Sequence, residues 1–490
     1  MVDRLSPLDV SFLYLEEPTT PMHVGGVAIF EVPEDGFDYE RLVHLIRTRI
    51  ALVPRYRQRV RWVPGHLANP IWVDDENFDV TYHVRRSALP RPGTDEQLNE
   101  LVARIMGRPL DRNRPLWEMY LVEGLEDGRF AILTKTHHAM VDGASAVDIG
   151  QVILDGTPEP REVPSDDWHP MREPSSAELI AGAVNEIARS PKAVVDTVRT
   201  SMIDVQETVT HIGRNVVGLA SAARTISRPA RSGPLNATIG GARRFATTET
   251  ELDKLKRIKR AHGGTINDIV LTVVAGGLRA WMMTRGEVVT ARSSIRAMVP
   301  VSVRTPGDNS GNQIAAFLCD LPIGEPDPVI RLQRVRFEMD MLKDSGQMLG
   351  ATALVGVASF TPPTLHSLGA RVVSGLSRRV YNVVVTNVPG PQFPLYAGGA
   401  LMLAAYPVVP LARGQAVSIG LTSYDGGMFV GLNADREAMP DVEVLAQCIE
   451  DAIEDMLATV TSGGRARRTK RPAAQRDDRR PVGPSAQAQA

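Results

Sequence analysis

Short apolar runs alternate with segments of helical character over the first third of the chain. The apolar runs predict strands over residues 24–32, 118–122 and 130–138, and a helical segment is expected over residues 42–52. Asp127-Gly128 lies between the last two runs, and this dipeptide between apolar segments is a strong signal for a hairpin. Strands mixed with helices in this way indicate an α/β unit built around a sheet.

A different pattern follows a proline-rich, acidic interval at residues 156–174. Over residues 195–219, apolar side chains recur at alternating spacings of three and four, which places them on one stripe of a helix. This stripe predicts a long amphipathic helix that links two domains and packs on one of them. A short coiled coil and a helix lying on lipid are the alternatives, and the mixed charges of the polar face disfavour lipid.

Alternating strands and helices resume at about residue 244 and predict a second α/β unit. The expected elements are a helix over 265–283, strands over 295–303 and 380–386, a hairpin formed by 418–424 and 428–433, and a terminal helix over 441–459. The predicted organisation is a first domain at residues 1–180, a helical linker at 181–235, a second domain at 236–462 and a disordered basic tail at 463–490.

The charge and cysteine content narrow the classes of protein. Of the 490 residues, 55 are Lys or Arg and 57 are Asp or Glu, so no chain-wide positive field favours nucleic acid. The tail is the exception, because its eight basic residues against two acidic ones leave the rest of the chain at about −8. Cys319 and Cys448 are the only cysteines, which excludes a disulfide framework and a Cys-type metal site and favours a reducing, cytoplasmic location.

No segment of the sequence predicts a membrane span. The first residues lack the basic start and the unbroken apolar run of an export signal. The nearest approach to a span, residues 397–412, is shorter than the ~20 residues that cross a bilayer and is interrupted by Pro407 and Pro410. We therefore expect any contact with a lipid droplet or with the inner face of a membrane to be peripheral, with the basic tail as the first place to look for it.

The densest group of reactive side chains is the run Thr136-His137-His138-Ala139-Met140-Val141-Asp142-Gly143. Adjacent histidines at the end of a strand point to opposite faces, so only one of them faces a given cleft. A histidine at a strand end suits a general base, because its pKa lies near neutrality and the turn at Gly143 fixes its place. Two structural roles remain open: Asp142 as an ordinary helix N-cap, and histidines that only bind the backbone.

Other chemistries find less support around this run. A zinc site of the HExxH type is absent, no Cys or third His lies nearby, and adjacent strand histidines diverge, so no metal is expected. The sequence Gly143-Ala144-Ser145-Ala146-Val147 lacks the second glycine of a serine hydrolase elbow, and the chain has no GxxxxGK[ST] loop for nucleotide phosphates.

The motif HHxxxDG at residues 137–143 resembles the signature of the acyl-CoA-dependent acyltransferases that are similar to chloramphenicol acetyltransferase. Further motifs, in order along the chain, resemble the bacterial wax ester synthase/acyl-CoA:diacylglycerol acyltransferase family: Leu5-Ser6-Pro7-Leu8-Asp9 with Thr20-Pro21-Met22-His23-Val24-Gly25, Pro115-Leu116-Trp117, Asn267-Asp268-Ile269-Val270-Leu271, Val299-Pro300-Val301-Ser302-Val303-Arg304 and Asn387-Val388-Pro389-Gly390-Pro391. The resemblance covers roughly residues 4–460.

This resemblance implies an α/β fold of two chloramphenicol acetyltransferase-like domains, each a mixed sheet with covering helices, joined by the helical linker and meeting along a tunnel. It also implies that His138 takes the proton from an acceptor hydroxyl as this attacks the thioester of acyl-CoA, without a covalent intermediate. Acyl-CoA is then a co-substrate, and no cofactor is expected. A positioned base of this kind increases the rate about 10²- to 10⁴-fold.

The resemblance assigns further roles with alternatives beside them. His137 supports His138, Gly143 provides the turn, and Asp142 is mainly structural, pairing with an arginine for which Arg304 and Arg296 are both candidates. Asn267 is the candidate donor to the oxyanion, with a helix-start cap as the equal alternative. Trp117 is expected to line the acyl channel or to be only core, and Asp268 and Arg304 are the remaining candidates for substrate contact.

Three functions stay open from the sequence. The first is transfer of a long-chain acyl group to diacylglycerol, which gives triacylglycerol. The second keeps the chemistry but uses a long-chain alcohol, as in a wax ester synthase, or the hydroxyl of a complex lipid. The third is a lipid-binding protein without turnover, which the complete motif with both histidines disfavours.

Overall fold

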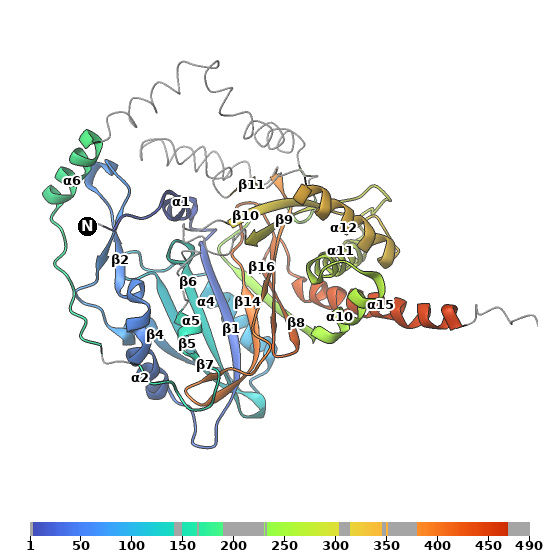
Figure 1. Ribbon diagram of the computed structural model, residues 1–490, viewed down its shortest axis with the longest axis horizontal. Coiled ribbons are helices and arrows are strands. Elements are labelled where there is room, and N and C mark those ends of the chain that lie inside the picture. The colour runs from blue at the N-terminus through green and yellow to red at the C-terminus, as the bar shows by residue number, and fades with distance from the viewer. Residues whose placement is uncertain are drawn as a thin grey trace, which may run out of the picture.

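The computed structural model describes residues 3–141, 149–163, 166–189, 230, 233–302, 314–344, 349–350 and 380–468. Within these ranges, two seven-stranded mixed sheets lie side by side and helices cover them (Figure 1). The apolar stripe predicted over residues 195–219 lies outside the described residues. The boundaries predicted for the two domains and the linker therefore stay predictions.

The first sheet has the strand order β4-β5-β6-β1-β14-β13-β7. Its members are β4 (Val84–Ala88), β5 (Trp117–Leu125), β6 (Arg129–His137), β1 (His23–Glu31), β14 (Ala400–Val408), β13 (Tyr396–Ala397) and β7 (Leu154–Asp155). The strands predicted at 24–32, 118–122 and 130–138 are thus confirmed as β1, β5 and β6. The hairpin is confirmed as well, since Asp127 and Gly128 take positive φ values of 61° and 65° between β5 and β6.

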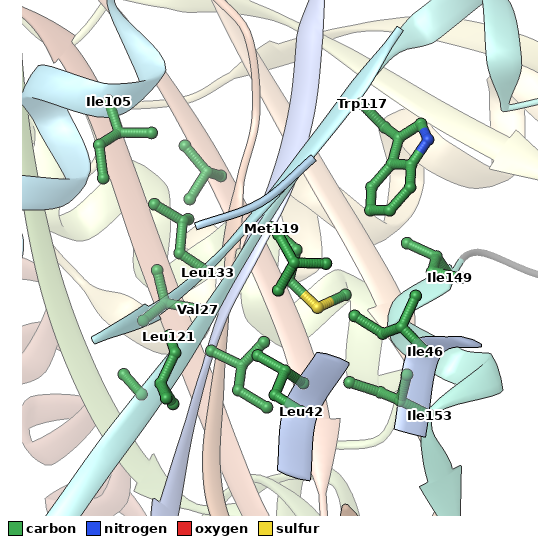
Figure 2. Packing of buried hydrophobic residues seen from close by; sticks show 14 of the residues in the cluster. Val27, Leu42, Ile46, Ile105, Trp117, Met119, Leu121, Leu133, Ile149 and Ile153 are labelled. Atoms are coloured by element: carbon green, nitrogen blue, oxygen red, sulfur yellow. The ribbon is translucent and has the colours of Figure 1, made fainter. Parts of the chain in front are cut away.

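Helices cover both faces of the first sheet, because the central strands are apolar on both sides. On one face, α2 (Tyr39–Arg49) buries Leu42 and Ile46 in the core shown in Figure 2. On the other face, α4 (Asp95–Met106) begins with a capping box between Thr94 and Gln97. Its C-terminal end is capped by the buried Lys135 of β6, whose Nζ donates to the carbonyls of Ile105 at 3.1 Å and Arg108 at 2.7 Å.

The second sheet has the order β11-β10-β9-β12-β15-β16-β8. Its strands are β11 (Leu349–Gly350), β10 (Ile314–Leu321), β9 (Ile295–Ser302), β12 (Val383–Pro389), β15 (Val417–Tyr424), β16 (Gly427–Asp435) and β8 (Arg243–Glu251). The helices that pack with it are α10 (Leu252–His262), α11 (Ile266–Thr284), α12 (Pro328–Asp344) and α15 (Val442–Arg468) (Figure 1). The predicted helix at 265–283, the strand at 295–303 and the hairpin at 418–433 are confirmed, whereas the strand predicted at 380–386 begins three residues later.

The shorter elements mostly lie in the first half of the chain. They are α1 (Pro7–Leu15), η1 (Ile50–Leu52), η2 (Pro54–Arg57), β2 (Gln58–Arg61), η3 (Pro64–His66), β3 (Ile71–Asp74), α3 (Val80–His83), η4 (Glu126–Gly128), η5 (His138–Met140), α5 (Ile149–Val152) and α6 (Ser176–Arg189). The terminal helix α15 runs past its predicted end at residue 459 to Arg468, and therefore includes the first residues of the predicted tail. Ala and Arg, which favour helix, occupy residues 465–468.

One helix among the described residues, α11, is long and apolar enough to cross a membrane. Two thirds of its apolar window, 67%, is buried inside the protein. It packs on α15 so closely that a Cβ atom on Gly277 would lie 2.6 Å from the side chain of Ile449. Burial of this kind is typical of the core helix of a folded domain.

The apolar stretch at residues 397–412 forms the strand that joins the two sheets. Its main part, β14, pairs with β1 in the first sheet, although it comes from the second half of the sequence. Side chains of the second sheet hold its end, since Ser418 Oγ and Asn433 Nδ2 both donate to the carbonyl of Val409 at 2.7 Å. The first sheet is therefore completed by a strand that the sequence pattern placed in the second unit.

Two glycines let this crossing strand approach the second sheet. A Cβ atom on Gly431 of β16 would lie 2.1 Å from the backbone oxygen of Pro407, and one on Gly420 of β15 would lie 2.8 Å from the Val409 side chain. Distances this short do not occur between ordinary atoms. A side chain at Gly431 would therefore separate the strand from the sheet, whereas one at Gly420 would require the side chains of Val409 and Pro407 to shift.

We predict that Gly431→Ala lowers the free energy of unfolding by about 1–3 kcal/mol or more, because the added methyl group meets a backbone atom that cannot rotate away. Thermal unfolding followed by circular dichroism measures this. Gly182→Ala is the matched control, because the space around this exposed glycine of α6 is open and alanine favours a helix. Equal melting temperatures for Gly431→Ala and wild type would contradict the close approach.

Candidate active site

The two histidines lie where β6 ends and η5 begins. The backbone N–H of His137 donates to the carbonyl of Leu116 at 2.9 Å, and that of His138 donates to the carbonyl of Met22 at 2.8 Å. The chain leading into β1 and the chain leading into β5 therefore fix the backbone on both sides of the pair. His137 is buried, with 1% of its surface exposed, whereas His138 is partly exposed.

The ring of His138 lies against Phe12 of α1. The two ring centroids are 4.0 Å apart and the planes are inclined by 18°, which is a stacked arrangement. Nδ1 of His138 is buried without a hydrogen-bond partner among the described side chains, so Nε2 is the nitrogen that remains for a substrate. The stacking contact with Phe12 fixes the plane of the His138 ring, and the residue remains partly exposed.

The surroundings of His138 keep its imidazole neutral. Burial lowers the pKa of His138 to about 4, the carbonyl of His138 itself acts in the opposite direction, and the neighbouring His137 lowers the pKa further. A neutral imidazole has a free lone pair, which a general base needs. The side chain is thus in its basic form across the physiological pH range.

We predict that kcat/KM is constant from about pH 8 to pH 5 and decreases at lower pH. A general base acts in its neutral form, so the role that the sequence predicts for His138 implies activity that is retained above its pKa of about 4 and lost as the pH falls through that value. Folding stability responds earlier: a histidine held at about 4 gains a proton more readily when unfolded, so stability decreases below about pH 6.5. Short assays after a pH jump separate the loss of activity from the loss of folding stability. A decrease in kcat/KM with a midpoint near pH 6.5 would contradict the low pKa of His138.

A buried carboxylate, which the sequence analysis missed, lies behind His137. Oε1 of Glu16 is 3.2 Å from Nε2 of His23, and Oε2 is 3.6 Å from Nε2 of His137 and 2.9 Å from Nε of Arg112. Burial raises the pKa of Glu16, but these three neighbours outweigh it and hold the pKa well below its usual range. Burial also lowers the pKa of His23 to about 4, with Glu16 acting in the opposite direction.

No group of three or more His, Cys, Asp or Glu side chains with the geometry of a metal site occurs in the part of the chain that the structure describes.

Comparison with known proteins decides the family. The wax ester synthase/diacylglycerol acyltransferase catalytic domain matches residues 5–270, and the WS/DGAT C-terminal domain matches residues 310–457. A Mycobacterium bovis relative named as a diacylglycerol O-acyltransferase is 33% identical over 471 residues, which are 93% of this chain and 99% of that protein. The chain belongs to the wax ester synthase/diacylglycerol acyltransferase family. It is an acyltransferase.

Further relatives of this WS/DGAT protein agree. A Mycobacterium tuberculosis protein named as a probable diacylglycerol O-acyltransferase, tgs3, is 46% identical over 263 residues, 53% of this chain and 96% of that protein. The structure of the wax ester synthase/diacylglycerol acyltransferase from Marinobacter aquaeolei VT8 covers 94% of this chain with a TM-score of 0.66 and 27% identity. A condensation domain of the CDA synthetase shares the fold at 14% identity, with a TM-score of 0.55. The predicted α/β fold of two chloramphenicol acetyltransferase-like domains is confirmed.

Trp117 of the WS/DGAT protein is part of the core. Its side chain is 0% exposed and lies in the cluster of buried side chains in Figure 2. Its Nε1 donates to the carbonyl of Tyr56 at 2.8 Å, and its ring stacks on His83 with the centroids 4.6 Å apart. The first residues of β5 pair beside the end of β6, with Trp117 opposite Thr136. Of the two roles expected for Trp117, the structure therefore favours the core, and no exposed surface is available to an acyl chain.

Asn267 and Asp268 begin α11, and the structure separates their roles. Asp268 belongs to a capping box: its Oδ2 accepts from the N–H of Thr265 at 2.7 Å, and its own N–H donates to Thr265 Oγ1 at 3.1 Å. Thr265, rather than Asn267, is the N-cap. Asn267 is partly exposed in the first turn, and no hydrogen bond to another described residue holds its amide. The cap is thus excluded for Asn267, and the oxyanion role stays a prediction.

Of the four remaining predicted residues, only Arg296 lies within the described part of the structure. Asp142, Gly143 and Arg304 lie outside the described residues, so their roles stay predictions. Arg296 of β9 lies within them and forms a two-point ion pair with Asp320, with Nε 2.8 Å from Oδ1 and a terminal nitrogen 3.1 Å from Oδ2. Its pairing with Asp142 stays a prediction.

Proposed function

We propose that this acyltransferase moves a long-chain acyl group from acyl-CoA to the free hydroxyl of diacylglycerol, which gives triacylglycerol and CoA. The observation that carries the proposal is the neutral, partly exposed His138, held between two backbone hydrogen bonds at a strand end within a chain of the WS/DGAT family. The relatives named as diacylglycerol O-acyltransferases in Mycobacterium support this choice of acceptor.

In the proposed reaction, Nε2 of His138 accepts the proton of the acceptor hydroxyl as the oxygen attacks the thioester carbonyl. The carbon–sulfur bond then breaks, the new ester bond remains, and the proton passes from the imidazole to the CoA thiolate. Every atom is accounted for without a covalent enzyme intermediate. The hydroxyl is a weak nucleophile at neutral pH, so the positioned base contributes about 10²- to 10⁴-fold to the rate.

A long-chain alcohol is the second acceptor to consider, because the Marinobacter structure that covers 94% of this chain is named as both a wax ester synthase and a diacylglycerol acyltransferase. Both acceptors present one hydroxyl on an apolar chain, and the same base serves both. Either acceptor also requires the protein to meet lipid, and we propose that this contact is peripheral.

An acceptor panel tests the proposal. The full chain is incubated with palmitoyl-CoA and, in parallel, with dioleoylglycerol, hexadecanol or no acceptor; CoA release is followed with a thiol reagent, and products are identified by mass spectrometry. We expect triacylglycerol to form at the highest kcat/KM. If wax ester forms faster, the preferred acceptor is a long-chain alcohol and not diacylglycerol. If no acceptor leads to CoA release, a lipid-binding protein is favoured.

A further inference from the structure

Glu16 is the point at which three separate parts of the first domain meet. It is the C-cap residue that follows α1, and its side chain is 9% exposed. Its carboxylate contacts His23 at the start of β1 and His137 at the end of β6. Arg112, from the segment between α4 and β5, is the third side-chain partner, and the backbone N–H of Met22 also donates to Oε1 at 3.4 Å. We call Glu16 and its three side-chain partners the Glu16 anchor. Arg112 donates a hydrogen bond to the carboxylate, whereas Nε2 of His23 and Nε2 of His137 lie within ion-pair distance of it, so removal of the charge affects all three side chains.

The backbone of Ala139 fixes the proton position of His137, and Glu16 lies on the protonated side of the ring. The N–H of Ala139 donates to Nδ1 of His137 at 3.0 Å, so a neutral His137 carries its hydrogen on Nε2, 3.6 Å from Glu16. Ala139 lies inside η5, the turn that begins with His138. The carboxylate of Glu16 therefore stabilises the His137 side chain, which accepts a hydrogen bond from the turn η5 that carries His138.

The anchor also fixes the helix that stacks on the base. The N–H of Glu16 donates to the carbonyl of Phe12, and a terminal nitrogen of Arg112 donates to the carbonyl of Leu13 at 2.9 Å. Phe12 is the residue whose ring lies 4.0 Å from the ring of His138. The carboxylate of Glu16 thus acts on the last turn of α1 through Arg112, and this turn presents Phe12 to the imidazole.

We propose that Glu16 is a positioning residue for the base: through His137 and through Phe12, it orients the His138 ring toward the reacting hydroxyl. The inference rests on the proposed function for its kinetic test. Glu16 does not exchange protons with substrate in this arrangement, because its oxygens face His23, His137 and Arg112.

The next residue along the chain provides a matched control. Glu17 carries the same carboxylate and also pairs with an arginine, Arg413, at 3.0 Å, but it is 33% exposed and contacts neither histidine. Glu17→Gln therefore removes one charge and one ion pair at the same end of α1. It leaves the Glu16 anchor intact.

We predict that Glu16→Gln lowers kcat for CoA release by about 10- to 100-fold, because small displacements of a catalytic group have effects of this size. Glutamine keeps the shape and one accepting oxygen, so KM for palmitoyl-CoA stays within about twofold and the melting temperature stays close to that of wild type. Glu17→Gln keeps kcat, KM and stability. A Glu16→Gln enzyme with the kcat of wild type overturns the proposal, and so does one whose kcat, KM and melting temperature all change together.

A double-mutant cycle with Phe12→Leu tests the route through the stacked ring. If Glu16 acts partly through Phe12, the kcat of the double variant exceeds the value expected from multiplying the two single losses. If the loss of kcat in the double variant equals the product of the two single losses, Glu16 does not act through Phe12. Should Glu16→Gln fail to fold, Phe12→Leu alone decides: at an unchanged melting temperature it must lower kcat without raising KM, and an unchanged kcat rejects the stack as the orienting contact.

A measurement without turnover separates this inference from the proposed function. The protein is labelled with ¹⁵N-histidine, and the ring signals of His138 are assigned by their loss in His138→Ala. We expect Glu16→Gln to shift them and Glu17→Gln to leave them in place. If the wild-type protein releases no CoA, the proposed function is wrong, but the positioning role of Glu16 is not affected. If the His138 signals are unchanged in Glu16→Gln, the positioning role of Glu16 is wrong.

Discussion

His138→Ala lowers kcat for CoA release by about 10²- to 10⁴-fold, the range that a positioned general base contributes. The ring lies partly exposed under Phe12 and its Nδ1 makes no side-chain hydrogen bond among the described residues, so its removal has little effect on folding. CoA release from palmitoyl-CoA with dioleoylglycerol is the assay, and the melting temperature is the check on folding.

His44→Ala is the control for this variant, since His44 is exposed on α2, away from the described site. It is expected to have the kcat of wild type. Unchanged CoA release in His138→Ala would remove the base from the mechanism. A loss accompanied by a large decrease in melting temperature would show that His138 acts on folding instead.

Trp117→Ala is expected to produce the largest loss of stability among these variants. The side chain is fully buried and packs on Tyr56 and His83, and its removal also deletes the hydrogen bond from Nε1 to the Tyr56 carbonyl. Truncation of a buried tryptophan costs about 3–5 kcal/mol, which corresponds to a decrease in melting temperature of roughly 10 °C for a domain of this size.

The same variant distinguishes the two roles expected for Trp117. Because its ring has no exposed surface, the relative kcat/KM for C8, C12 and C16 acyl-CoA stays as in wild type under conditions where Trp117→Ala remains folded. A changed chain-length preference would support the acyl channel instead. Trp62→Ala, at a partly exposed ring beside Tyr14, is the control for loss of an indole and changes the melting temperature less.

The local pattern predicts elements well and their partners poorly. Strands such as β1 and β6 are correctly placed because their apolar runs are bounded by turn residues, and Asp127-Gly128 marks the hairpin between β5 and β6. The stretch at 397–412 shows the limit: its apolar content is visible, but nothing local to it indicates β1 as its neighbour. Pairing between strands so far apart depends on the whole fold.

The candidate site shows the same division. His138 follows from the spacing of its motif and from the direction of alternate strand residues. Glu16 does not, because its partners His137 and Arg112 come from distant segments and Glu17 beside it has the same chemistry. The available signal was a carboxylate directly after an apolar stretch, followed by His23 at the start of a strand. Only the folded structure shows which of the two adjacent glutamates is buried.

The position of β14 in the first sheet has a consequence for folding during synthesis. β1 leaves the ribosome about 370 residues before β14, which at 5–20 residues per second is roughly 20–70 s. Throughout that time, the edge of β1 that will pair with β14 has no partner from its own chain. An unpaired edge favours association with other chains, so the newborn protein depends on a chaperone or on rapid completion to avoid aggregation.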